Sequence, residues 1–144
     1  AMDPEVLILD EPTAGLDPVV RDEVLEIFQD FMQDENHAIL FSSHITSDID
    51  KIADYLTFIN DGEILFSVTT DELLGEAGIL KCSAEEAEAL DAERDGLLRI
   101  RKNQFGCEIL VRNKEQLRLR YPEAVIDSVT TEALMLFYAR GDEV

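Results

Sequence analysis

The chain has 144 residues, of which 46% are hydrophobic, and a formal net charge of -20 from 12 basic and 32 acidic residues. The hydrophobic content excludes a disordered chain, and the length is sufficient for one domain or two small ones. The acidic excess argues against a nucleic-acid-binding surface and against unaided binding to anionic lipid, because both need clustered Lys and Arg.

No stretch approaches the roughly 18 continuous apolar residues of a membrane-spanning helix, and the N-terminus lacks a signal-peptide pattern. We therefore expect no direct membrane insertion, and any membrane role to depend on a partner. Cys82 and Cys107 lie far apart in the sequence without metal-ligand spacing. They are most simply free thiols in a reducing compartment.

The first predicted element is the aliphatic run Val6–Leu9, which leads directly into Asp10 and Glu11. A short apolar run bounded by turn residues is typical of a strand buried on both faces in a parallel sheet. Ligands bind at the C-terminal edge of such sheets, so the two carboxylates are candidates for a binding or catalytic site. From these residues alone, a core strand that ends in a solvated acidic turn is the alternative.

A helix over residues 18–33 follows, because Asp17 is a good N-cap and Pro18 suits the first helical position. A second short strand, residues 38–41, leads into Ser42-Ser43-His44 and so repeats the first unit, with polar residues at the strand end. The expected core stripe of the helix consists of Val20, Val24, Ile27, Phe28 and Phe31.

A hairpin is predicted next, with strands over residues 55–59 and 63–68. Asp61-Gly62 lies between them, and these residue types tolerate the positive φ values of a tight turn. Gly75 and Gly78 bracket a small linker. We therefore predict a first region over residues 1–75 and a second over residues 76–144.

The second region has the predicted order β-α-β-β-α-β, which is the ferredoxin-like pattern. A last helix, about residues 131–139, is apolar nearly all round and needs burial on more than one side. Packing between the two regions is favoured there over contact with another chain. The elements expected before it are strand 79–83, helix 84–92, strands 97–103 and 106–112, helix 114–120 and strand 124–129.

The segment DEPTAGLDP, Asp10–Pro18, together with its preceding strand, resembles the Walker B strand and D-loop of ATP-binding-cassette (ABC) ATPases at every position. His44 has the position of the family's switch histidine, and the resemblance extends strongly to about residue 70. The implied fold is the C-terminal part of a P-loop NTPase (ABC ATPase) α/β sheet, followed by a small α+β ferredoxin-like extension.

The resemblance implies ATP and Mg²⁺ as cofactors of the full-length protein. Asp10 would bind Mg²⁺, directly or through a water molecule, and Asp10 and His44 would contact the nucleotide. Glu11 would be the general base that polarises water, placed on the opposite side of the extended chain from Asp10, and His44 would donate a hydrogen bond to the γ-phosphate. The D-loop, expected at the interface between two ATP-binding domains, comprises Ala14, Gly15, Leu16 and Asp17.

Two further family motifs are missing from the sequence. No pair of glycines five apart is followed by Lys, and no Gly-Gly occurs, so the phosphate-binding loop and the signature motif are absent. We expect the chain to be the C-terminal portion of a longer subunit, and by itself neither to bind ATP tightly nor to hydrolyse it. Its uncovered sheet edge would favour a dimer, a domain swap or a companion fragment.

The sequence TAGLDP and the closing segment VTTEALMLFYARG resemble ABC-2 type exporter subunits of bacteria. This resemblance implies a cytoplasmic ATPase at the inner membrane face that powers a separate permease together with a second ATP-binding subunit. One alternative is a soluble, non-transport ABC ATPase. Another is a regulatory or dimerisation module in residues 79–129. The transported substrate and the permease are not encoded in any motif.

Overall fold

The computed structural model describes residues 5–143, so residues 1–4 of the first predicted region lie outside the described chain. Contacts divide the chain after Ala53 into two compact units. The predicted hairpin belongs to the second compact unit, whereas the sequence regions placed it in the first. The boundary of the ABC-like region at residue 75 stays a prediction.

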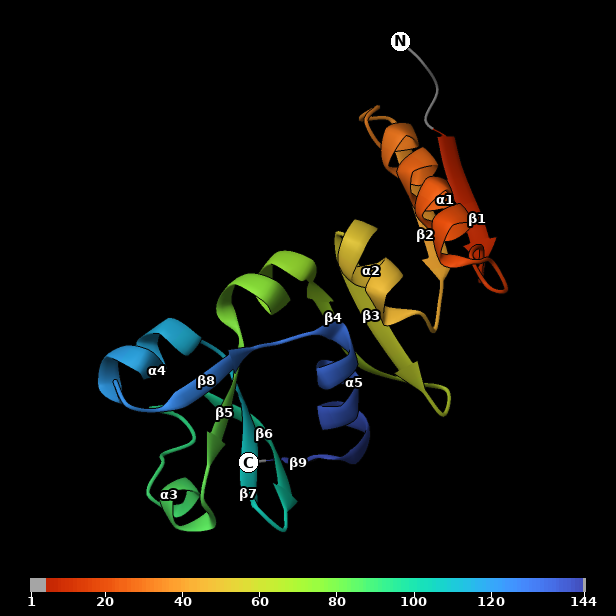
Figure 1. The fold of residues 1–144 in the computed structure, drawn as a ribbon. Coiled ribbons are helices and arrows are strands. Elements are labelled where there is room, and N and C mark those ends of the chain that lie inside the picture. Colours follow the sequence, from red (N-terminus) through yellow and green to blue (C-terminus); the bar gives the residue numbers. More distant parts are fainter. Residues whose placement is uncertain (1–4, 144) are drawn as a thin grey trace. The chain divides into compact units, whose positions relative to one another are not determined.

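The first unit contains β1 (Glu5–Asp10), α1 (Pro18–Phe31), β2 (His37–Ser42) and α2 (Thr46–Ile52) (Figure 1, red to yellow). β1 and β2 are parallel, in a register that places Asp10 opposite Ser42. The polar residues that end the two strands therefore meet at one edge. Asp17 caps α1 as predicted, because its carboxylate accepts hydrogen bonds from the N–H groups of Val19 and Val20, each at 3.0 Å.

The expectation that β1 is buried on both faces is wrong for this chain. Ile8 is 76% exposed, and Val6 and Leu40 are exposed as well. The reason is that, within residues 5–143, this sheet has only the two strands β1 and β2. The predicted stripe of α1 is likewise only half-buried or exposed, and the side chain that α1 buries is Leu25.

The second unit begins with the antiparallel hairpin of β3 (Tyr55–Asn60) and β4 (Glu63–Thr69). Its turn residues Asp61 and Gly62 have φ values of +50° and +77°, which confirms the predicted tight turn. A π-helical turn, Glu72–Glu76, follows.

The rest of the second unit is a five-stranded sheet in the order β8-β5-β7-β6-β9, with every pair antiparallel (Figure 1, green to blue). When β9 is left out and the strands β5 to β8 are counted as first to fourth along the chain, they lie in the order fourth, first, third, second. This is the ferredoxin-like arrangement that the sequence predicted. Its elements are β5 (Gly78–Cys82), α3 (Ala84–Glu88), β6 (Leu97–Asn103), β7 (Gly106–Val111), α4 (Lys114–Arg120), β8 (Val125–Ser128) and β9 (Asp142–Glu143).

The main core of the second unit lies between one face of this sheet and the segments of α3 and α4. Ile109 and Val111 of β7 are almost fully buried there against Leu117 of α4, with Ala87 of α3 packed beside them. Cys107, Ile109 and Val111 lie at alternate positions of β7 and therefore share the face of the sheet that carries this core.

The last helix, α5 (Thr131–Arg140), buries Leu134 and Phe137. Its Tyr138 ring lies 4.9 Å from the ring of Phe66 in β4, and the guanidinium of Arg99 in β6 lies 4.6 Å from the Tyr138 ring centre. The helix is thus packed against both the hairpin and the ferredoxin-like sheet, as its apolar composition required. Within residues 5–143, no helix has the length and apolar character needed to cross a membrane.

Candidate catalytic site

The polar residues at the ends of β1 and β2 form a small hydrogen-bonded cluster. The Ser42 hydroxyl donates to Asp10 Oδ1 at 2.5 Å and accepts from the backbone N–H of Glu11 at 3.2 Å. The Ser42 carbonyl also accepts from the Glu11 N–H, at 3.0 Å. Because the parallel register places Asp10 opposite Ser42, the strand pairing itself builds this cluster.

Glu11 has a left-handed backbone conformation, with φ of +47°. The predicted position of its side chain along an extended chain is therefore wrong, because the chain turns at this residue. For a residue with a side chain, this conformation costs on the order of 1–2 kcal/mol. Such strain persists where surrounding contacts enforce it, and it occurs preferentially at functional sites.

The turn directs the Glu11 carboxylate to His44. Glu11 Oε1 lies 3.0 Å from His44 Nδ1, although 33 positions separate the two residues. A carboxylate only accepts hydrogen bonds, so Nδ1 carries the proton of this contact. The other carboxylate oxygen, Oε2, is buried and has no hydrogen-bond partner among the residues that the structure describes.

Asp10 is exposed and keeps one carboxylate oxygen free of Ser42. Among residues 5–143, no group of three or more His, Cys, Asp or Glu side chains could hold a metal ion by itself. A single carboxylate with a neighbouring hydroxyl fits Mg²⁺, which keeps several waters and takes one or two carboxylates together with substrate phosphates. The residues present are thus compatible with Mg²⁺ delivered with a phosphate ligand.

The predicted D-loop is a compact turn between β1 and α1. The Ala14 N–H donates to the Glu11 carbonyl at 3.2 Å, and the Leu16 N–H donates to the Thr13 carbonyl at 3.3 Å. Gly15 has φ of +78°, a conformation that glycine adopts without strain. Ala14 and Gly15 are exposed, so their backbone is accessible to another molecule.

One interaction in this unit was not foreseen from the sequence. The Thr13 hydroxyl donates to Asp48 Oδ2 at 2.5 Å, and the two residues are only 2% and 3% exposed. Arg21 Nε in α1 lies 3.7 Å from Asp48 Oδ1. Asp48 therefore connects the turn after Glu11 to α2, the helix that follows His44.

The sequence did not indicate the buried position of Asp48, because the residues around it are typical of a helix cap. Ser47 and Asp50 resemble a capping box, yet α2 begins after Ile45 with no side-chain cap. Asp48 instead lies beside the buried Ile49 on the covered side of the helix. A charged residue at such a position needs a buried partner, and Thr13 supplies it.

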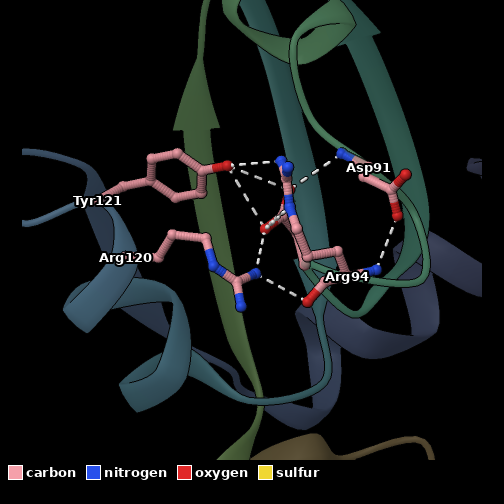
Figure 2. A network of polar contacts seen from close by, with 5 residues as sticks. Asp91, Arg94, Arg120 and Tyr121 are labelled. Atoms are coloured by element: carbon pink, nitrogen blue, oxygen red, sulfur yellow. Dashed lines mark hydrogen bonds and ion pairs between the residues drawn. The ribbon is translucent and has the colours of Figure 1, made fainter.

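A second polar network surrounds Asp95 in the ferredoxin-like unit (Figure 2). Its fully buried carboxylate accepts from Arg120 at 2.5 Å, from Arg94 at 3.1 and 3.3 Å and from the Tyr121 hydroxyl at 3.2 Å. The backbone N–H of Asp91 adds a bond of 2.9 Å. Burial alone would raise the pKa of Asp95, but these hydrogen bonds outweigh burial and hold that pKa well below its ordinary value. Because every oxygen is satisfied, we assign this network a structural role.

Comparisons with known proteins relate the chain to a family of ATP-binding proteins. It is 48% identical over 73 residues to the energy-coupling factor transporter ATP-binding protein EcfA2 of Clostridioides difficile (strain 630), covering 51% of this chain and 25% of that protein. It is 38% identical over 100 residues to EcfA2 of Enterococcus faecalis (strain ATCC 700802 / V583), covering 65% and 35%. An ABC transporter ATP-binding protein of Mycoplasma pneumoniae is 41% identical over 71 residues, covering 49% and 22%.

The chain is homologous to ABC transporter ATP-binding proteins. It spans about a quarter to a third of the length of the EcfA2 relatives. No family model matches it. A solved metal-chelate type ABC transporter in an inward-facing conformation gives a TM-score of 0.43 at 21% identity, over 78% of this chain and 42% of that one, too slight a likeness to add to the sequence comparison. The ABC homology agrees with the Walker B and D-loop resemblance.

Proposed function

We propose that this chain forms part of the ATP-hydrolysis site in the ATP-binding subunit of an ABC transporter. The observation that carries the proposal is the contact between Glu11 and His44 at the ends of two parallel strands. These residues, with Asp10 beside them, are the ones that the resemblance to DEPTAGLDP and the switch histidine assigned to catalysis. The similarity to proteins named as transporter ATP-binding proteins supports the same activity.

Each residue has a distinct role in this proposal. Asp10, oriented by the Ser42 hydroxyl, holds Mg²⁺, and the bound ion would supply charge neutralisation at the phosphate oxygens. Glu11 is the general base, whose carboxylate would polarise the attacking water and accept its proton. His44 holds the carboxylate through Nδ1, which fixes the orientation of the base.

The Glu11 contact restricts what His44 can donate. Since Nδ1 carries a proton toward Glu11, a neutral imidazole presents only an acceptor at Nε2. His44 can therefore donate to a phosphate oxygen through Nε2 only as the imidazolium. The expected hydrogen bond to the γ-phosphate thus requires either a protonated His44 or release of the Glu11 contact.

An exchange experiment tests the catalytic assignment. The chain would replace its matching segment in the Clostridioides difficile relative, and ATP hydrolysis by the chimera would be measured. We expect Glu11→Gln to lower the rate by about 10²–10⁴-fold, the range for loss of a general base. Glu26→Gln, on the exposed face of α1, is the matched control and should leave the rate unchanged. An unchanged rate in Glu11→Gln would refute the assignment.

The chain alone is proposed to be inactive. Its seven glycines provide neither the phosphate-binding loop nor the signature motif, so the backbone amides and Lys that hold a triphosphate must come from other residues. Titration of the 144-residue chain with a fluorescent ATP analogue and Mg²⁺ should show no saturable binding in the micromolar range. Tight, saturable binding would contradict this proposal.

We further propose a separate membrane permease and a second ATP-binding subunit as partners, with the protein at the cytoplasmic face of the membrane. The exporter type is supported by the closing segment VTTEALMLFYARG and by TAGLDP, whereas the names of the relatives favour an energy-coupling factor transporter. Purification of the full-length subunit with its partners distinguishes a transporter subunit from a soluble, non-transport ABC ATPase. A multi-span membrane protein supports a transporter, and a ribosome would support the soluble ATPase.

The ferredoxin-like unit supports a second proposed role, in regulation or dimerisation. It has its own sheet and core, which do not contribute to the Asp10–Glu11–His44 cluster. The exposed apolar residues of β1 and β2 also favour association of the chain with a second chain. Sedimentation that shows a compact monomer at high protein concentration would count against a dimer.

A further inference from the structure

The two cysteines, which are distant in the sequence, lie opposite each other in the ferredoxin-like sheet. Cys82 ends β5 and pairs directly with Cys107 near the start of β7 in the antiparallel register. Two positions away, Leu80 and Ile109 are paired in the same way, and both belong to the core that Cys107 enters and Cys82 borders. Because side chains alternate along a strand, the two thiols lie on the same face of the sheet.

The backbone geometry at this pair matches what a disulfide needs. Directly opposed residues of antiparallel strands have Cα atoms about 4.5–5.5 Å apart. Disulfides join Cα atoms about 4.4–6.8 Å apart. The strands also approach closely here, since a Cβ added to Gly106 would lie 2.5 Å from the Cys82 carbonyl oxygen. Both thiols are free.

We propose that Cys82 and Cys107 form a redox-sensitive pair, which a hydroperoxide converts to an intrachain disulfide and which a dithiol returns to two thiols. The proposal concerns a modification site outside the proposed catalytic cluster and does not depend on ATP hydrolysis. It also fits a reducing compartment, where such a bond forms only while oxidant is present.

Cys82 reacts first because it is half-buried, whereas Cys107 is only 4% exposed. The Cys82 sulfur attacks one peroxide oxygen, the O–O bond breaks, and a sulfenic acid and a water or alcohol result. The Cys107 sulfur then attacks the Cys82 sulfur, which forms the S–S bond and releases the sulfenic oxygen as water. The two thiols lose their protons, and their two electrons reduce the peroxide.

The surroundings oppose spontaneous oxidation. Burial, and next the neighbouring Cys107 and Glu86, raise the pKa of the Cys82 thiol above its ordinary value. The reactive thiolate is therefore scarce at neutral pH. The pair thus oxidises more slowly than an exposed thiol of ordinary pKa, in air-equilibrated buffer and with peroxide alike, and its conversion to the disulfide needs added peroxide.

Peptide mapping of the whole 144-residue chain tests the proposal. The reduced, folded chain is treated with hydrogen peroxide, remaining thiols are alkylated in denaturant, and the product is digested with trypsin. We expect a chain lighter by two hydrogen atoms, with no alkylated cysteine and with peptide Cys82–Arg94 joined to peptide Asn103–Arg112. Dithiothreitol should restore two alkylatable thiols.

Two matched variants establish the order of reaction. Cys107→Ser should stop at a Cys82 sulfenic acid, which dimedone traps, whereas Cys82→Ser should keep Cys107 reduced because that thiol is buried. The wild-type result decides the proposal even if a variant fails to fold. Oxidation of Cys82 to sulfinic acid without the linked peptides, disulfides only between chains, or a linkage that forms only in denaturant would each overturn it.

Discussion

The Thr13 hydroxyl and the Asp48 carboxylate form a buried 2.5 Å hydrogen bond that joins the turn after Glu11 to the helix after His44. Asp48→Ala would leave the Thr13 hydroxyl unpaired and remove the partner of Arg21. We expect a loss of about 1–3 kcal/mol in the free energy of unfolding of the first unit, the range for a buried polar group left unsatisfied.

The first unit can be followed separately during urea unfolding, because both histidines of the chain, His37 and His44, belong to it and give resolvable NMR signals. Glu26→Ala, on the exposed face of α1, is the control and should leave the urea midpoint of the first unit unchanged. If Asp48→Ala unfolds at the same urea concentration as the wild type, the bond contributes nothing to stability.

The left-handed conformation of Glu11 predicts that the backbone at this position lowers the stability of the folded chain. Glu11→Gly would relieve the strain, whereas Glu11→Ala would remove the same carboxylate and keep a Cβ at φ of +47°. We expect the Gly variant to be more stable than the Ala variant by about 1 kcal/mol, slightly less than the full strain because glycine gains entropy when unfolded. Equal urea midpoints for the two variants would show that the backbone at Glu11 is unstrained.

The contact between Glu11 and His44 predicts which imidazole nitrogen carries the proton. In the wild type, a neutral His44 should be protonated at Nδ1, since Nδ1 faces the Glu11 Oε1 acceptor. Nitrogen-15 NMR of the ring distinguishes the two tautomers. In Glu11→Ala, the proton should shift toward Nε2, and His37, whose Nδ1 contacts the Phe31 carbonyl, should not change. The same His44 spectrum in both proteins would contradict the contact.

Local signals predicted the position of the elements well. Asp17-Pro18 begins α1 and Asp61-Gly62 makes the hairpin turn, because caps and turns depend on neighbouring residues. The order β-α-β-β-α-β was sufficient for the ferredoxin-like sheet, since few topologies connect these elements with short loops.

Properties that depend on distant residues were not predictable in the same way. The apolar Ile8 predicted a buried strand, but burial depends on what covers the strand, and here its side chain is exposed. Ser42 stabilises the turn at Glu11 through a hydrogen bond, and Thr13 forms the buried hydrogen bond with Asp48. In each pair, the two residues are more than 30 positions apart in the sequence. The motif predicted which residues form the proposed site, and tertiary contacts determine the orientation of these residues in the structure.

The network around Asp95 predicts how the second unit responds to acid. The hydrogen bonds of Arg94 and Arg120 hold the pKa of Asp95 in the folded chain far below the ordinary value of 3.8. As the pH falls, Asp95 is therefore protonated at a higher pH in the unfolded chain than in the folded one. The stabilisation is complete above about pH 5, decreases as the pH falls through 3.8, and is lost toward the folded pKa. The unit should therefore become less stable between pH 5 and pH 2.

Asp95→Asn should lower the free energy of unfolding at pH 7 by about 2 kcal/mol, less than the roughly 3–5 kcal/mol for a fully buried ion pair, because both arginines are partly exposed. It should also reduce the dependence of stability on pH below 5, because its side chain does not titrate. Asp127→Asn, which breaks the exposed pair with Lys81, is the matched control and should change stability far less. The stability of the wild type and of both variants is measured by urea unfolding with Tyr fluorescence as the signal. This signal reports on the second unit, because Tyr55, Tyr121 and Tyr138 belong to it. An Asp95→Asn variant with the wild-type slope of stability against pH would show that Asp95 does not govern acid unfolding.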